Sequence, residues 1–155
     1  AAVAWAPAPT WPAWALLATI GAWVAVIDAI TTWIPAVLAW TGWVGWIGAV
    51  VVTALSDHTA AIRAVIATAI IFAAWMIAWL ISRGGFGFSD VRITPLWAAP
   101  VAATGIDTIQ VTVIAGLTLI ALYALIDRFR HHTTRFLPWA PSLCSGALIG
   151  LAIAH

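Results

Sequence analysis

The chain has 155 residues, of which 65% are hydrophobic and 7% are charged, with a mean hydropathy of +1.09. A soluble domain carries about 25% charged residues, so this composition excludes a soluble globular protein and predicts one integral-membrane domain over residues 1–155. The net charge of +1, from six arginines without a lysine, excludes a nucleic-acid-binding footprint, and the single cysteine, Cys144, excludes an intrachain disulfide.

Apolar runs predict the membrane-spanning helices in chain order. Residues 1–12 are rich in proline and tryptophan, which is typical of an interfacial lead-in rather than of a helix. The runs then cover approximately residues 12–34, 36–55, 60–82, 93–105 and 107–126, and a last run after Pro138 and Pro141 ends at His155. At about 20 residues for each span, the length allows about six helices, and the fourth run is marginally short. We therefore expect an all-α, polytopic membrane helix bundle.

Glycines and polar residues mark the packing and the turns of this bundle. Gly42, Gly45 and Gly48 recur every third residue in the second run, and such small residues permit close helix approach. Residues 56–58, Ser-Asp-His, predict a polar turn before the third run. The glycine-rich segment over residues 83–92 cannot be regular helix throughout, because each helical glycine costs about 1 kcal/mol.

The distribution of arginine predicts the orientation in the membrane. Loops on the cytoplasmic side carry the excess of positive charge. Five arginines fall in one set of predicted loops: Arg83, Arg92, Arg128, Arg130 and Arg135. The other set holds only Arg63, beside Asp57 and Asp107. The first set is therefore expected in the cytoplasm, with the amino-terminal end of the chain outside.

Two aspartates are predicted to share one face of the membrane. Asp28 lies near the inner end of the first predicted helix, and Asp90 lies just beyond the inner end of the third. Two complete crossings separate them, and an even number of crossings returns the chain to the same face. Each aspartate also has a structural interpretation: Asp28 as an interfacial residue hydrogen-bonded to Thr31 and Thr32, and Asp90 as a cap of the fourth helix.

As a pair, these carboxyl groups offer a specific chemistry. Acidic residues at bilayer depth cost about 2.5 to 3.5 kcal/mol on insertion scales and usually line a bundle interior or a polar cavity. Two carboxylates held close in a low dielectric do not both ionise, so one keeps its proton at neutral pH. The ionised group takes a proton from water that attacks a peptide carbonyl, and the protonated group hydrogen-bonds the carbonyl oxygen. Nearby glycines would let an extended substrate backbone come close.

Three segments resemble the motifs of one family of membrane enzymes. Residues 28–35, Asp-Ala-Ile-Thr-Thr-Trp-Ile-Pro, resemble the Asp-x5-Ile-Pro-Asn segment of type IV prepilin peptidases. Residues 84–92, Gly-Gly-Phe-Gly-Phe-Ser-Asp-Val-Arg, resemble their Gly-Gly-x-Gly-x-Gly-Asp-x-Lys segment. Residues 137–143, Leu-Pro-Trp-Ala-Pro-Ser-Leu, are similar to their Ile-Pro-Phe-Gly-Pro-x-Leu segment. The resemblance covers nearly the whole chain in order and spacing.

The resemblance implies an integral aspartic endopeptidase, a hydrolase of type IV pilus and protein secretion systems. Such an enzyme cuts the leader, or signal peptide, from prepilin or pseudopilin precursors at the cytoplasmic face of the cell membrane, and it needs no metal or other cofactor. Asp28 and Asp90 would be the catalytic carboxylates. The same motifs supply the supporting or substrate-binding candidates Ile34, Pro35, Gly84, Gly85, Gly87, Ser89 and Arg92. Larger members also methylate the new amino terminus and carry a loop with paired cysteines, which this chain lacks, so the short, peptidase-only form is expected.

Three positions depart from the motifs and keep other functions open. Ala36 replaces asparagine, Ser89 replaces the glycine before the second aspartate, and Arg92 stands where lysine is usual. Arginine is bulkier and forked, so the exchange is not neutral at a contact site. One alternative is a catalytically silent homologue that serves as a membrane subunit of a pilus or secretion machine. Another is an aspartate-dependent proton or cation transporter, which predicts inverted repeats that the halves of the chain do not display.

The remaining polar residues have structural interpretations. Residues 56–58 hold the residue types of a hydrolase triad, but neighbours in sequence do not converge as a triad requires. His131 and His132 have no further ligand types nearby, whereas a zinc site needs three or four, so a solvated loop is expected. Cys144 lies in an apolar run and is interpreted as a small packing residue. No feature of the sequence predicts an oligomeric state.

Overall fold

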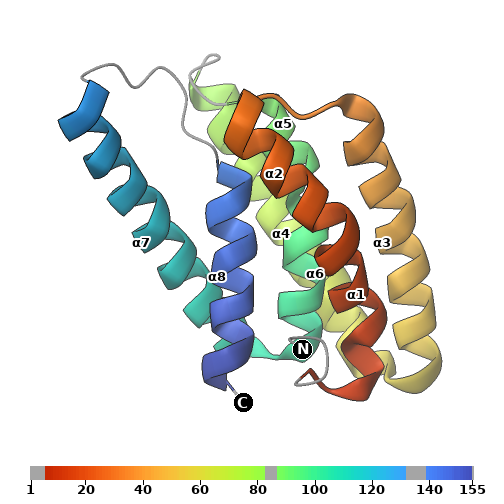
Figure 1. Ribbon diagram of the computed structural model, residues 1–155. Coiled ribbons are helices and arrows are strands. Elements are labelled where there is room, and N and C mark those ends of the chain that lie inside the picture. Colours follow the sequence, from red (N-terminus) through yellow and green to blue (C-terminus); the bar gives the residue numbers. More distant parts are fainter. Residues whose placement is uncertain (1–5, 83–86, 132–138, 155) are drawn as a thin grey trace.

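The computed structural model describes residues 6–82, 87–131 and 139–154, and each regular element within these ranges is a helix (Figure 1). The prediction of an all-α bundle is therefore confirmed. Four helical stretches are long and apolar enough to cross a membrane: Ala8–Thr31, Ala36–Ser56, His58–Ser82 and Ile106–Phe129. The other two predicted runs form shorter helices.

The first long helix is assembled from consecutive pieces. A 3-10 turn, η2 (Ala8–Thr10), leads into α1 (Trp11–Leu16), the π-helical turn η3 (Leu17–Gly21) and α2 (Ala22–Thr31). Helical structure begins earlier than predicted, because Pro9 and Pro12 occupy first-turn positions in which no helical N–H is needed. It ends at Thr31 rather than near residue 34, because Thr32 adopts a left-handed conformation with φ of 52°.

A tight polar turn joins the next two helices, α3 (Ala36–Ser56) and α4 (His58–Ser82). Asp57 forms this turn in an extended conformation, and its Oδ1 accepts a hydrogen bond of 2.9 Å from the backbone N–H of Ala60. An aspartate in this position satisfies one of the free N–H groups at the start of a helix. The predicted turn is confirmed, and Asp57 caps α4.

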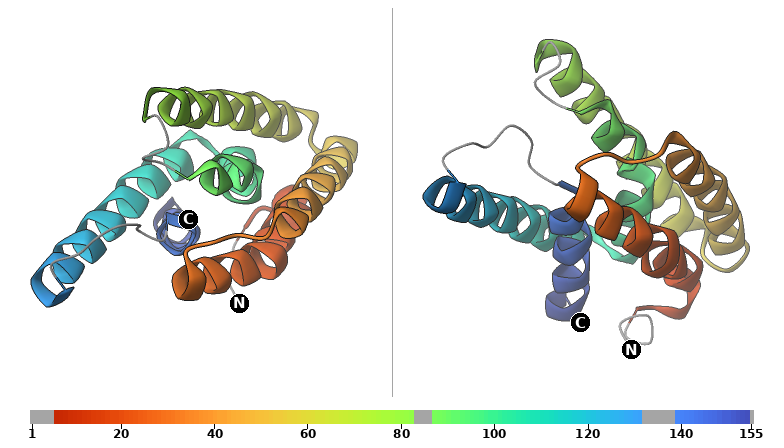
Figure 2. Two further views of the ribbon diagram at one scale, coloured as in Figure 1. Left: turned by 90° about the horizontal axis from the view of Figure 1, so that it is seen from above. Right: turned by 45° about the horizontal axis from the view of Figure 1, so that its top comes forward.

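The predicted fourth run forms a helix at the centre of the bundle. α5 (Phe88–Arg92) is followed, after Ile93 alone, by α6 (Thr94–Thr104), whose residues 94–103 are all buried. Helices α1, α3, α4, α7 and α8 pack around it, and Figure 2 shows it enclosed when the bundle is seen from above. With 11 residues α6 is too short to span a bilayer by itself, so its neighbours and not lipid provide its surroundings.

The last two described helices, α7 (Ile106–His131) and α8 (Trp139–Ala154), pack closely on each other. Their approach depends on glycines of α8 that face α7. A Cβ atom at Gly146 would lie 2.7 Å from the backbone oxygen of Thr112 and 2.8 Å from the backbone nitrogen of Gly116. A Cβ atom at Gly150 would also meet the Thr112 side chain. α8 packs against α2 on another side.

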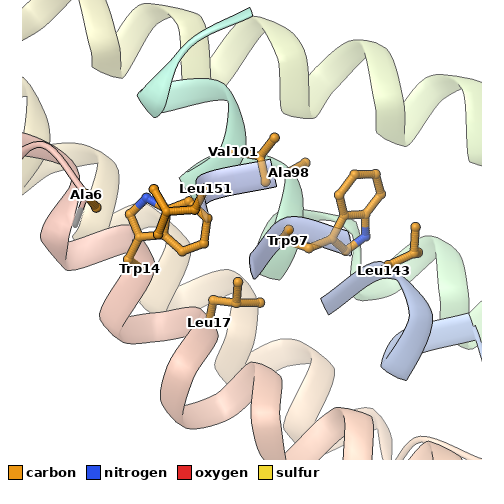
Figure 3. Packing of buried hydrophobic residues seen from close by; sticks show 9 residues of the cluster. Ala6, Trp14, Leu17, Trp97, Ala98, Val101, Leu143 and Leu151 are labelled. Carbon is orange, nitrogen blue, oxygen red and sulfur yellow. The ribbon is translucent and has the colours of Figure 1, made fainter. Parts of the chain in front are cut away.

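A hydrophobic core lies where α1, α6 and α8 meet (Figure 3). Its buried residues are Ala6, Trp14, Leu17, Trp97, Ala98, Val101, Leu143, Ala147 and Leu151. The buried Trp14 ring uses its polar edge as well, because Nε1 donates a hydrogen bond of 2.9 Å to Oγ1 of Thr104 at the end of α6. The core thereby ties the first helix to the central helix and to the last one.

The glycines predicted to permit close packing in α3 do so at two of three positions. A Cβ atom at Gly42 would lie 2.9 Å from the Leu96 side chain of α6, and one at Gly45 would meet the Leu16 side chain of α1. Gly48 has nothing within 4 Å of that position. The three-residue stride therefore turns the third glycine away from the neighbouring helices.

The helix directions give the bundle two ends (Figure 1). The C-terminal end of α2, the short helix α5, the last turn of α7 and the start of α8 lie at one end, which we call the aspartate end because it holds Asp28 and Asp90. The junctions between α3 and α4 and between α6 and α7 lie at the opposite end. There Arg63 donates a hydrogen bond of 3.0 Å to the carbonyl oxygen of Ala103.

Candidate active site

The candidate site is defined by two buried acidic residues. Asp28 is 3% exposed and Asp90 is 8% exposed. Among the residues whose burial the structure describes, they are the only buried aspartate, histidine, arginine or tyrosine side chains. An ionisable group in a membrane bundle requires a compensating environment, and such groups mark functional sites by default.

Asp28 is held by the start of the last helix. It lies in the final turn of α2, and its Oδ2 accepts a hydrogen bond of 3.0 Å from the backbone N–H of Ala140. The backbone N–H of Trp139 also donates to this carboxylate. The contact joins residues that are 112 positions apart in sequence. The third motif of the sequence, from Trp139 onward, therefore supplies the hydrogen-bond donors of the first.

The structural interpretation of Asp28 through its neighbouring threonines is wrong. The Thr31 hydroxyl donates to the carbonyl oxygens of Ile27 and Trp33, and the Thr32 hydroxyl donates to the carbonyl oxygen of Thr31. Both hydroxyl groups thus donate to backbone carbonyl oxygens at or just beyond the end of α2, and not to the Asp28 carboxylate. The burial of Asp28 also excludes a hydrated interfacial position.

Asp90 approaches the site from the short helix α5. The helix starts after Gly87, whose backbone is extended with φ of −71° and ψ of 129°. The N–H of Asp90 donates a hydrogen bond of 3.1 Å to the Gly87 carbonyl oxygen. The interpretation of Asp90 as a cap of the fourth predicted helix is wrong. Neither α5 nor α6 has a side-chain cap hydrogen bond, because Asp90 lies inside the first turn of α5 with its carboxyl group buried.

The two carboxyl groups interact electrostatically. Desolvation by burial, followed by the charge of Asp28, raises the pKa of Asp90 to about 7. Asp90 belongs to α5, outside the four helices that are long enough to span a membrane. Since a like charge acts only over a short distance in this way, the fold brings together the two aspartates that the sequence places 62 positions apart.

Gly87 and Ser89 surround the Asp90 carboxyl group closely. A Cβ atom at Gly87 would lie 3.1 Å from Oδ2 of Asp90 and 3.1 Å from the Ser89 hydroxyl oxygen. The space beside the carboxyl group therefore depends on the absence of a side chain at position 87. Ser89, which the motif comparison marks as a departure, adds its hydroxyl to the same turn.

Arg92 points to an aromatic group rather than to the aspartates. Its guanidinium carbon lies 5.2 Å from the centre of the Phe88 ring, which is a cation-π distance. The Phe88 ring in turn packs on Trp79 of α4, with 5.0 Å between ring centres. The Arg92 Nε atom is buried without a hydrogen-bond partner in the part of the chain that the structure describes. Phe88 therefore joins α5 to α4, and Arg92 packs on the Phe88 ring within α5.

Ile34 and Pro35 lie in the segment that joins the end of α2, next to Asp28, to the start of α3. Ile34 is buried in a cluster with Val24, Ile93, Leu96 and Ala140. Pro35 directly precedes α3. The Ile-Pro pair thus fixes the chain where it leaves Asp28 and turns into the next helix.

Some of the predicted residues lie outside the ranges that the structure describes. These are Gly84 and Gly85 of the second motif, residues 137 and 138 of the third, and His132. No group of three or more histidine, cysteine or acidic side chains that could hold a metal occurs within residues 6–82, 87–131 and 139–154. Cys144 packs against the core, with its Sγ 3.8 Å from the carbonyl oxygen of Gly21.

An apolar groove runs along α2 and α8 toward the aspartate end. Its volume is about 580 Å³, and its lining includes Ala25 and Ala29 of α2 and Pro141 and Leu148 of α8. Ala29 adjoins Asp28, and Pro141 follows the residue that donates to Asp28. Neither this groove nor the α8 donors are predicted from the sequence above. Alanines at positions 18, 22, 25 and 29, which share one helix face, were the available signal for the groove.

Comparison of the chain with protein-family models, with curated protein sequences and with solved structures gives no match. The chemistry of the site is therefore interpreted from its own residues and geometry.

Proposed function

We propose that the chain is a membrane aspartic endopeptidase of the prepilin-peptidase type, in which Asp28 and Asp90 activate a water molecule. The observation that carries the proposal is the burial of these two aspartates at one end of the bundle, within electrostatic range of each other. One ionised and one protonated carboxyl group are what acid-base hydrolysis of a peptide bond requires. The reaction needs no metal or other cofactor.

The three motifs and an apolar groove beside the site support a prepilin-type substrate. The apolar groove along α2 and α8 would offer an apolar segment of a prepilin or pseudopilin precursor an approach to the aspartates from within the membrane. The peptide bond to be cut would then lie at the aspartate end. The arginine distribution favours the cytoplasmic side of the cell membrane for that end.

The three residues that depart from the motifs differ in how close they lie to the two aspartates. Ala36 is exposed at the start of α3, and Arg92 packs on Phe88. Ser89 alone lies in the turn that carries Asp90, with its hydroxyl next to Gly87. Ser89 is therefore the departure whose side chain would determine whether the chain is active or a catalytically silent homologue.

Co-expression with prepilin-like substrates tests the proposal. The unaltered chain is expected to shorten at least one precursor, and Asp28→Asn and Asp90→Asn should each lower the cleavage rate by about 100-fold or more, because each removes one partner of the acid-base pair. Asp107→Asn is the matched control, since Asp107 is an exposed aspartate in the first turn of α7. It should cleave at the normal rate.

Cleavage that survives both replacements would refute the dyad. Failure of the unaltered chain on several precursors, with Ser89→Gly restoring cleavage, would identify a silent homologue. Aspartate-dependent proton flux in liposomes without any cleavage would instead favour the transporter.

A further inference from the structure

We infer that the first turn of α8 determines which of the two aspartates is ionised. The N–H groups of Trp139 and Ala140 stabilise Asp28 as the ionised base, and Asp90 is the protonated acid. This assignment rests on the proposed function for its catalytic meaning. The protonation pattern itself rests on the hydrogen bonds to Asp28 and on the burial and like charge at Asp90.

The hydrogen bonds at Asp28 favour the charged form and offset the cost of burying it. The carboxylate accepts the 3.0 Å hydrogen bond from Ala140 and a second one from Trp139, both at the N-terminal end of a 16-residue helix. The free N–H groups of a helix start carry a partial positive charge that favours an anion. Pro141 has no N–H, and the first two N–H groups of the helix, those of Trp139 and Ala140, both donate to Asp28. Hydrogen bonds donated to an ionised carboxylate are stronger than bonds between neutral groups.

The geometry at Asp90 favours the neutral form. Its carboxyl group is buried next to Gly87 and Ser89, and α5 has only five residues, which gives it a weak helix start. The helices packed against α5 are α3, α4 and α6, and α3 and α6 contain no charged residue. The charged or titratable residues of α4 are His58 and Arg63, at the opposite end of the bundle.

The remaining charges near the pair do not reverse this pattern. Arg92, on α5 itself, is stacked on Phe88, and Cys144 of α8 is a thiol rather than a cation. Asp28 therefore has two donors and Asp90 has the like charge of Asp28 as its neighbour. The single proton shared by two such groups goes to Asp90, whose carboxyl group accepts no hydrogen bond from the residues that the structure describes.

The assignment gives a balanced reaction. Asp28 takes a proton from water while the water oxygen bonds to the peptide carbonyl carbon, and Asp90 gives its proton to the carbonyl oxygen, which forms a neutral diol. Asp28 then passes its proton to the amide nitrogen, the carbon–nitrogen bond breaks, and Asp90 recovers a proton from a diol hydroxyl. The products are a carboxylic acid and an amine, and both aspartates return to their starting states.

Infrared spectroscopy of the purified chain in lipid nanodiscs tests the assignment without any substrate. The chain has five aspartates and no glutamate, so its carboxyl region holds few bands. At pH 6 one protonated carboxyl band is expected, because exposed aspartates are ionised there. Asp90→Asn should remove this band, and Asp28→Asn should keep it. A band that persists in Asp90→Asn and disappears in Asp28→Asn, or its absence from the unaltered chain, would overturn the assignment.

Removal of the α8 donor tests its part in the assignment. Ala140→Pro lacks the N–H that Asp28 uses, whereas Ala140→Gly keeps it and serves as the control. In Ala140→Pro the ionised Asp28 band should be lost at a pH about one unit higher than in Ala140→Gly, the size expected for one charge-assisted hydrogen bond. Equal midpoints in the two variants would overturn the role of α8. If Ala140→Pro does not fold, the two asparagine variants still decide the assignment.

The outcomes separate this inference from the proposed function. The expected infrared pattern in a chain that cleaves no precursor would refute the peptidase and leave the protonation pattern standing. A reversed pattern in a chain that does cleave would refute the assignment and leave the peptidase standing.

Discussion

Asp90 links pH to both stability and the proposed reaction. Its pKa rises from 3.8 to about 7 in the folded chain, because burial disfavours the charged form and Asp28 adds a like charge. Between these two values the folded chain binds a proton that the unfolded chain has lost, so the free energy of unfolding falls as pH rises. Below about pH 4 both states are protonated, and above about pH 7 both are ionised.

We therefore expect the melting temperature in detergent to fall as pH rises from about 4 to about 7 and then to level off. Asp90→Asn should weaken this dependence, because asparagine does not titrate. Asp107→Asn, at an exposed position, should leave the profile unchanged. Thermal unfolding followed by circular dichroism measures the three profiles, and an identical slope in Asp90→Asn would contradict the prediction.

At the residue level, the sequence predicted the aspartate pair but not how each member is held. Counting crossings depends only on hydrophobic runs, and it put Asp28 and Asp90 at the same end. The local explanations failed because the hydroxyls of Thr31 and Thr32 bond to the backbone carbonyls of their own helix end. The donor from Ala140 comes from 112 residues away, and no local pattern encodes such a contact.

The α7–α8 contact is the closest approach between helices described above. The backbone of Thr112 and Gly116 lies against Gly146. The position of α8 against α7 depends on the absence of a side chain at Gly146. Because the first turn of α8 donates to Asp28, this contact also sets the position of the donors. Gly146 and the donor Ala140 thus lie on the same helix, Gly146 at its contact with α7 and Ala140 at Asp28.

Gly146→Ala should destabilise the chain by about 1 to 3 kcal/mol, because its Cβ would meet backbone atoms that have no side-chain freedom to move aside. Gly48→Ala is the matched control, a glycine inside a helix with nothing within 4 Å. It should be neutral or stabilising by up to about 1 kcal/mol, since alanine is the better helix former. Thermal unfolding in detergent compares the two, and equal melting temperatures would contradict the packing argument.

At the level of elements, the apolar runs were predicted well and their roles less well. α3 and α4 match their predicted runs because each is long and apolar and ends at the polar Asp57 turn. α6 is also a helix, but hydropathy alone does not tell a helix buried in protein from one that faces lipid. The marginal length of the run was the signal that it lies at the centre of the bundle.

At the level of the whole molecule, the described arginines are more numerous at the aspartate end than at the opposite end. Arg92 and Arg128 lie at the aspartate end, and Arg63 and Asp107 lie at the other. The 26 residues of α7 span about 39 Å at 1.5 Å for each residue, so its two ends reach opposite faces of a bilayer. The proposed orientation places the arginine-rich end in the cytoplasm.

Cysteine labelling tests this orientation. In a Cys144→Ser background, Asp107→Cys should react with a membrane-impermeant thiol reagent added to intact cells, and Arg128→Cys should react only after the cells are permeabilised. Both positions are exposed, so access to the reagent depends on the side of the membrane. The opposite labelling pattern would place the candidate site outside the cytoplasm.

The hydrogen bond between Asp28 and α8 also sets an order of assembly. Asp28 and Asp90 leave the ribosome well before α8, and until α8 is made and packs against α2, Asp28 lacks the donors at Trp139 and Ala140. A partly synthesised chain thus contains both aspartates in the membrane without a completed site. The pairing of Asp28 with its donors therefore belongs to the later steps of assembly, and the proposed activity would wait for α8.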